Sequence, residues 1–288
     1  MRLITFEHNE ATSIGALVGD EVVDLCAADK TLPACMIGFI AGGSASLEAA
    51  GKAVESGEHR LPAGDLTIKA PVSNPEKVLC VGLNYADHAK ESGMEPPPEP
   101  VMFSKFTSAI IGPGETIVLP EESEEPDYEV ELVIVIGEGG RHIEEADAMD
   151  HVFGYTVGHD VSARDWQLRK PGGQWLMGKT FDTFAPIGPA IVTSDEISDP
   201  HNLGIRLRLN GETLQDSSTS QLIFKTEELV AYISQVVTLK PGDLIFTGTP
   251  PGVGFARKPP VFLKPGDTAE CEIDEIGTLS NPVGGSGR

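Results

Sequence analysis

The 288-residue chain is poor in cysteine, in basic residues and in long apolar runs. Its cysteines, Cys26, Cys35, Cys80 and Cys271, are widely separated. No Cys-x-x-Cys pair therefore indicates a zinc or redox site, and no dense cysteine framework indicates secretion. Lys and Arg number 21 against 44 Asp and Glu, which gives a formal net charge of -23. This balance disfavours nucleic acid and an anionic membrane surface as partners.

No apolar run approaches the length of a membrane span. The start of the chain, residues 1–7, is too short and too soon acidic for a signal or transit peptide. With its few cysteines the sequence fits a reducing compartment. We therefore expect a cytoplasmic protein, with a processed organellar form as the alternative.

An acidic stretch is the most informative feature that is present. Seven of the eleven residues from 121 to 131 are acidic and none is basic. The segment Tyr128 to Ile136 has the pattern of a strand, whose period of two places Glu129 and Glu131 on one face, with Cα atoms roughly 7 Å apart. Two adjacent carboxylates that lead into an apolar row repel each other unless a cation lies between them. The pattern indicates either a divalent-metal site or a half-exposed strand with an acidic outer face.

Two further segments contain candidate catalytic or metal-binding residues. His88 and Glu91 are three residues apart, so they are neighbours on one face if this segment is helical. Gly93 and a proline-rich run follow them, which is typical of a mobile lid, although a plain surface histidine is the alternative. Asp160 comes at the end of a predicted strand, before a predicted helix, where site residues are common.

The chain divides into three parts by composition. The polar segment Glu58 to Asp65 contains Pro62 and Gly64, and it marks a boundary close to residue 70. We expect a small N-terminal domain over residues 1–70, a catalytic domain over 71–283 and a disordered tail over 284–288.

Several segments between residues 72 and 283 resemble the fumarylacetoacetate hydrolase superfamily, and they occur in the family's order. They are Val81 to His88, Pro100 to Lys105, Glu129-Val130-Glu131, His159 to Asp165, Gly178 to Phe181 and Thr247 to Pro250. The sequences of the segments Phe103 to Phe106 and Gly178 to Asp182 are most similar to one branch of this superfamily, the fumarylacetoacetate hydrolase domain-containing protein 2 branch. The resemblance implies a mixed α/β (α+β) fold, in which strands roll into a β-sandwich beside the small N-terminal domain, and a homodimer.

The resemblance also implies a site. It assigns a divalent metal to Glu129, Glu131 and Asp160, and catalytic roles to His88, Glu91 and Lys179. It assigns contacts with substrate oxygens to Arg164, Gln167, Lys179 and Thr249. Support of Asp160 is an alternative role for Arg164.

Three hard oxygen donors suit Mg²⁺ or Mn²⁺, and also Ca²⁺, and they leave positions open for a chelating 2-oxo acid. The expected reaction is hydrolysis of a carbon–carbon bond in an acylpyruvate or related 2,4-diketo acid, with His88 and Glu91 activating water and pyruvate released. The same residues would serve oxaloacetate decarboxylation, keto–enol tautomerisation or isomerisation of 2-hydroxyhepta-2,4-diene-1,7-dioate. A metal- or metabolite-binding protein without catalysis is the alternative outside enzymes.

Overall fold

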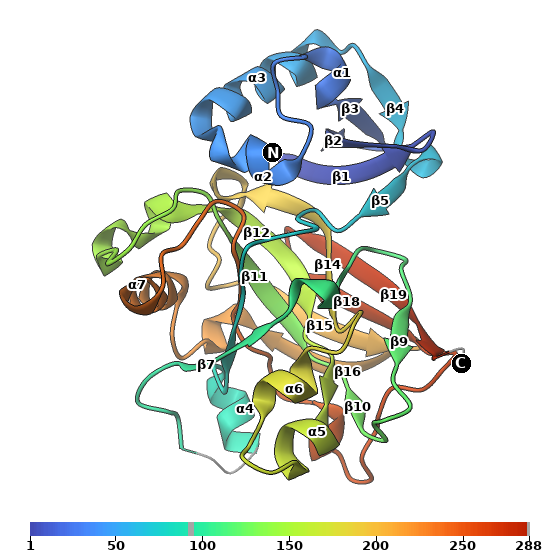
Figure 1. The fold of residues 1–288 in the computed structure, drawn as a ribbon, viewed down its shortest axis with the longest axis vertical. Coiled ribbons are helices and arrows are strands. Elements are labelled where there is room, and N and C mark those ends of the chain that lie inside the picture. The colour runs from blue at the N-terminus through green and yellow to red at the C-terminus, as the bar shows by residue number, and fades with distance from the viewer. Residues whose placement is uncertain (92–94, 287–288) are drawn as a thin grey trace.

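The computed structural model describes residues 1–91 and 95–286 and confirms the expected mixed α/β fold (Figure 1). Its strands form a 12-stranded sheet, a five-stranded sheet and a two-stranded sheet. In Figure 1 the N-terminal strands and helices gather at one end of the molecule, and α4, α5 and α6 lie at the other.

The large sheet runs through the whole molecule. Its main path has the order β4 (Arg60–Pro62), β3 (Glu21–Asp24), β2 (Ala11–Val18), β1 (Arg2–His8), β14 (Ala185–Thr193), β12 (Val152–His159), β11 (Val130–Ile136), β17 (Leu244–Phe246), β6 (Val78–Gly82) and β7 (Val101–Lys105). Two short strands branch from this path: β5 (Thr67–Lys69) pairs with β1, and β8 (Ile110–Ile111) pairs with β14. The pairs are antiparallel except β17 with β6 and β14 with β8.

The five-stranded sheet has the order β16 (Glu212–Ser218), β15 (Gly204–Leu209), β18 (Thr268–Ile273), β19 (Gly277–Gly285) and β9 (Ile117–Leu119). The two-stranded sheet pairs β10 (Pro126–Asp127) with β13 (Ser162–Ala163). β15 and β16 form a hairpin through Asn210 and Gly211, which both have positive φ, as a tight two-residue turn requires.

The helices are short and lie outside the sheets. They are α1 (Leu25–Ala28), α2 (Met36–Ala41), α3 (Gly43–Ser56), α4 (Ala86–Glu91), α5 (Arg164–Arg169), α6 (Trp175–Lys179) and α7 (Thr226–Val236). Single 3-10 turns occur at Ala63–Asp65, Thr107–Ala109, Glu145–His151, Ser194–Glu196, Thr219–Gln221 and Gly254–Ala256. Within the described ranges, none of the helices is long and apolar enough to cross a membrane.

β11 lies in the middle of the core, and all seven of its residues are buried. Leu132 and Ile134 belong to a cluster shared with the five-stranded sheet, whereas Val133 and Val135 pack with residues of the N-terminal strands and helices. The sequence-based alternative of a half-exposed strand with an acidic outer face is therefore wrong. Both faces are covered, which explains the nearly continuous apolar sequence of this strand.

The N-terminal part is joined to the rest through the large sheet. Arg2 and Leu3 of β1 pair with Val192 and Ile191 of β14. The boundary at residue 70 remains a prediction, since no gap in the sheet separates residues 1–70 from those that follow. At the other end, β19 continues to Gly285 and pairs with β9, so the strand extends into the predicted tail, whose residues 287 and 288 lie outside the described ranges.

Candidate active site

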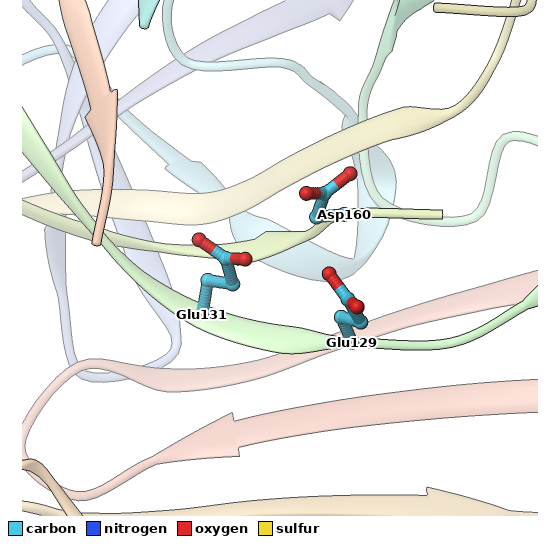
Figure 2. Close-up of side chains that lie close together, drawn as sticks. All are labelled: Glu129, Glu131 and Asp160. Carbon is cyan, nitrogen blue, oxygen red and sulfur yellow. The ribbon is translucent and has the colours of Figure 1, made fainter. Parts of the chain in front are cut away.

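Three buried carboxylates meet where β11 and β12 lie side by side (Figure 2). The antiparallel register places Val130 opposite His159, so Asp160, the residue after β12, lies next to Glu129. The backbone N–H of Asp160 donates to the carbonyl oxygen of Glu129 at 2.8 Å. One carboxylate oxygen from each of Glu129, Glu131 and Asp160 lies within 4.8 Å of the other two. Strand pairing thus adds the third carboxylate to the two that share a face.

Two buried lysines neutralise part of this charge. Lys179 Nζ lies 2.6 Å from Glu129 Oε2 and 2.8 Å from Asp160 Oδ2. Lys105 Nζ lies 2.6 Å from Asp160 Oδ1 and also donates to the carbonyl oxygens of Val161 at 3.0 Å and Phe184 at 2.7 Å. Asp160 is therefore held by one lysine on each oxygen. Lys105 belongs to the family-like segment Pro100 to Lys105, but the sequence alone predicts no role for it.

Arg164, at the start of α5, donates a hydrogen bond to another side chain from each of its three guanidinium nitrogens. It donates to Glu129 Oε1 at 2.5 Å, to Asp127 Oδ2 at 2.8 Å and to Gln167 Oε1 at 2.9 Å. The arginine therefore supports Glu129, whereas the sequence-based alternative placed it behind Asp160. The physical reason for this difference is that the guanidinium group, from the first turn of α5, reaches the carboxylates of Asp127 and Glu129.

The glutamates of the site differ in their partners. Burial alone would raise the pKa of Glu129, but Lys179 and Arg164 outweigh it and hold that pKa below its ordinary value. Glu131 accepts the backbone N–H of Gly248 at 2.8 Å and, across residues 1–91 and 95–286, forms no ion pair with a basic side chain. Burial, together with the charges of Asp160 and Glu129, raises the pKa of Glu131 well above its ordinary value.

The carboxylates open into a small pocket of about 60 Å³. The predicted residues that line it are His88, Glu129, Glu131, Arg164, Gln167, Lys179 and Thr249. Asp160 lies behind this surface beside Glu129, and Glu91 lies behind His88. The structure thus brings together residues from α4, β11, α5, α6 and the segment after β17.

His88 and Glu91 are neighbours on α4, as their spacing predicts. His88 Nδ1 lies 3.3 Å from Glu91 Oε2, and the Glu91 carboxylate accepts the Gly252 N–H at 3.2 Å. Asn84 fixes the start of this segment, because its amide donates to the carbonyl oxygen of Thr247 at 2.8 Å. Gly93, the predicted end of the turn, lies outside the described residues.

Thr249 and Gln167 have protein partners of their own. The Thr249 hydroxyl donates to the carbonyl oxygen of Val130 at 2.9 Å and accepts from Gln215 Nε2 at 2.9 Å. Gln167 uses its side-chain oxygen for Arg164. Both residues line the pocket, but the Thr249 hydroxyl also ties its loop to the start of β11.

Asp127 is a further buried carboxylate of this cluster, and it accepts a hydrogen bond from Arg164. It is fully buried, and its oxygens also accept the backbone N–H groups of Gly254 at 2.7 Å and Phe255 at 3.0 Å. Acidic residues as dense as those from 121 to 131 are ordinarily solvated, so the local sequence does not indicate that Asp127 is buried. Its spacing of two from Glu129 was the available signal.

Comparisons with known proteins identify relatives over almost the whole chain. The model of the fumarylacetoacetate (FAA) hydrolase C-terminal family matches residues 77–284. The chain is 55% identical over 287 residues to "Oxaloacetate tautomerase fahd2, mitochondrial" of Xenopus laevis, which covers 98% of this chain and 90% of the relative. A crystal structure of a putative HpcE protein from Mycobacterium smegmatis has a TM-score of 0.90 at 43% identity, and it covers 99% of this chain and 100% of that one. Maleylpyruvate hydrolase from Sphingobium sp. SYK-6, in complex with manganese(II) and pyruvate, has a TM-score of 0.82 at 33% identity and covers 99% of each chain.

The relatives correct one expectation and confirm another. The cytoplasmic location expected from composition is contradicted, because the Xenopus relative is named a mitochondrial protein. The expected branch is confirmed by the names of the relatives, and the expected enzyme is favoured over the alternative of a binding protein without catalysis. The chain belongs to the fumarylacetoacetate hydrolase family.

Proposed function

We propose that the protein is a divalent-metal-dependent enzyme that interconverts the keto and enol forms of a 2-oxo acid, with oxaloacetate as substrate. The observation that carries this proposal is the 55% identity with the Xenopus oxaloacetate tautomerase across 98% of the chain. The sequence analysis placed tautomerisation among the alternatives and hydrolysis first. The similarity now favours the alternative.

The donor set fits Mg²⁺ or Mn²⁺, with Ca²⁺ as a further hard cation. Glu129, Glu131 and Asp160 offer three carboxylate oxygens within 4.8 Å of one another, and hard oxygen donors are what these cations prefer (Figure 2). Glu131 is the group that most needs a cation, since its only hydrogen bond within the described ranges is to Gly248. A dication bound here would withdraw electrons from a chelated 2-keto oxygen.

The charges around the site favour an anionic substrate. Four buried carboxylates face three buried cations: Asp127, Glu129, Glu131 and Asp160 against Lys105, Arg164 and Lys179. Their formal sum is -4 + 3 = -1 with all groups ionised, so a dication brings the cluster to about +1. The three carboxylates alone with a dication would have given -1. The lysines and the arginine thus lower the negative charge of the site enough for it to attract the carboxylate of a 2-oxo acid.

We assign the proton transfer to His88. Enolisation breaks a C–H bond at C3, moves that electron pair into a C2–C3 double bond and places a proton on the 2-keto oxygen. His88 lines the pocket and can take the C3 proton, while Glu91 orients its ring through Nδ1. The reaction consumes no water, so the residues need only position the acid and move one proton.

Hydrolysis of an acylpyruvate is the second candidate. The observation that favours it is the likeness to maleylpyruvate hydrolase, whose structure holds manganese(II) and pyruvate. The same His88–Glu91 pair would then activate a water molecule, which must fit beside the substrate.

One set of assays on metal-stripped and reloaded protein separates these reactions. We expect Mg²⁺ or Mn²⁺ to restore an accelerated loss of oxaloacetate enol absorbance, with slower acylpyruvate cleavage and oxaloacetate decarboxylation. Glu131→Gln should lose this activity. Glu48→Gln, the same change on the exposed face of α3, is the matched control and should keep it. Faster acylpyruvate cleavage than enol conversion would favour the hydrolase, and activity that is equal with and without metal would contradict the proposal.

Two further proposals concern the setting of the enzyme. The name of the Xenopus relative supports a mitochondrial location for this chain. The homodimer implied by the family resemblance stays a prediction, which light scattering of the purified protein tests.

A further inference from the structure

The pocket has a charged floor and a mostly apolar rim. Its floor consists of buried residues and includes Glu129, Glu131 and Lys179. The side chains at the rim are half-buried, and they include Leu83, His88, Phe103 and Trp175. A 2-oxo acid that chelates a cation at the floor must therefore extend its C3 substituent toward this rim.

Trp175 is the largest rim residue and is held on two sides. A Cβ atom placed on Gly82 would lie 2.4 Å from Trp175 Cζ3, so the indole rests directly on the backbone of Gly82. Its ring also makes an edge contact with Phe103, with centroids 5.7 Å apart. Lys179, four residues later on α6, lies over the same Phe103 ring at 5.1 Å. The indole is thus fixed relative to the charged floor.

The space left by this arrangement is small. The cavity volume is about 60 Å³. Pockets for larger ligands typically measure about 300–1,000 Å³. The floor can therefore hold the chelating end of a 2-oxo acid, but a bulky C3 substituent would meet the indole.

We propose that Trp175 is a specificity-determining residue that restricts the enzyme to 2-oxo acids with a small C3 substituent, such as the carboxyl group of oxaloacetate. The inference rests on the proposed tautomerase function and names its substrate class. Gly82 allows the indole to take this position, because the three nearest atoms to a Cβ at residue 82 all belong to the Trp175 ring. A side chain at position 82 would displace the indole.

Phenylpyruvate, a 2-oxo acid with an aromatic C3 substituent, serves as the bulky probe. We expect Trp175→Ala to raise the ratio of kcat/KM for phenylpyruvate over oxaloacetate tautomerisation at least about tenfold, because a single methylene in a fitted pocket changes such ratios about 10- to 200-fold. Trp166→Ala is the matched control. Trp166 is the other tryptophan, lies on the neighbouring α5 and lines a different cavity, so its removal should leave the ratio within about twofold.

A second variant tests the contact with Gly82. Gly82→Ala should lower kcat/KM for oxaloacetate in the wild-type background but not in Trp175→Ala, because the three nearest atoms to the added methyl group all belong to the indole. Equal losses in both backgrounds would contradict the proposal. So would an unchanged substrate ratio in Trp175→Ala, or an equal loss on both substrates, which would make Trp175 a support for Lys179 instead.

Binding keeps this test separate from the proposed activity. The dissociation constants of pyruvate and phenylpyruvate for Mn²⁺-loaded protein are compared by calorimetry in wild type and Trp175→Ala. A relative gain of at least about tenfold for phenylpyruvate supports the size limit even if no tautomerisation is found, in which case only the proposed function fails. No relative gain, or no binding of either acid to either protein, overturns the size limit.

Discussion

Glu131→Gln should stabilise the metal-free protein and remove most of the stabilisation that Mn²⁺ gives the wild type. In the metal-free protein the Glu131 carboxylate is buried beside Glu129 and Asp160, and within residues 1–91 and 95–286 its one hydrogen bond comes from Gly248. A glutamine keeps an oxygen for the Gly248 N–H and presents an N–H₂ group to the two neighbouring carboxylates. The substitution therefore relieves a buried charge while it removes a proposed metal ligand.

The expected magnitudes follow from these two changes. Gly248 satisfies one oxygen of Glu131, and the second oxygen has no hydrogen bond in the described residues. A buried polar atom left in this state costs about 1–3 kcal/mol, so the metal-free variant should gain about that much. For a chain of this size, this corresponds to an increase in Tm of about 2 °C per kcal/mol. Loss of a ligand should weaken Mn²⁺ binding at least about 100-fold, since even supporting residues of metal sites contribute about 10- to 100-fold. At a Mn²⁺ concentration of 100 times the wild-type Kd, the wild type gains about 2.7 kcal/mol and the variant about 0.4 kcal/mol.

Thermal unfolding of both proteins in EDTA and in Mn²⁺, with calorimetric titration of Mn²⁺, measures these effects. Glu129→Gln is the matched control. Glu129 already pairs with Lys179 and Arg164, so the same substitution two residues away should destabilise the metal-free protein by about 3–5 kcal/mol. If metal-free Glu131→Gln were less stable than wild type, the charge on Glu131 would not be unfavourable. If both proteins gained the same stability from Mn²⁺, Glu131 would not be a ligand.

Two other substitutions and one ligand test the same site. Lys179→Met should destabilise the metal-free protein by about 3–5 kcal/mol, because Glu129 and Asp160 lose a shared cation. Urea unfolding without metal measures this change. An unchanged midpoint would mean that Lys179 does not stabilise the two carboxylates. His88→Ala should lower kcat/KM for oxaloacetate tautomerisation about 10²- to 10⁴-fold while calorimetric Mn²⁺ affinity stays constant, and full activity would place the base elsewhere. Oxalate, a planar mimic of the pyruvate enolate, should slow amide exchange in α4 when Mn²⁺ is present, whereas equal exchange would contradict closure of this helix over the substrate.

Part of the site follows from local sequence rules. The period of two along a strand places Glu129 and Glu131 on one face, and the helical spacing of His88 and Glu91 makes them neighbours. The position of Asp160 at the end of a predicted strand made it a candidate, but its role as a metal ligand came from the family resemblance. Its proximity to Glu129 depends on the register of β11 with β12, which no single stretch of sequence states.

The buried cations could not be predicted from their own segments. Lys105 ends β7, and its ammonium reaches Asp160, which is 55 positions later in the sequence. A lysine at the end of a strand is ordinarily solvated, so the local pattern predicts exposure. Only the assembled fold shows that Asp160 and the carbonyl oxygens of Val161 and Phe184 replace water around it.

The ion pairs explain how the carboxylates can be buried before any metal binds. Buried charges are tolerated when they are paired and hydrogen-bonded, and Glu129 and Asp160 each contact two basic side chains. The backbone of β11 is fixed separately, by apolar packing on both of its faces. The core and the basic residues therefore set the positions of the carboxylates, and Glu131, which stands outside these ion pairs in the described part of the chain, retains a strong electrostatic preference for a cation. We therefore expect removal of the Glu131 carboxylate to weaken Mn²⁺ binding while the fold stays intact.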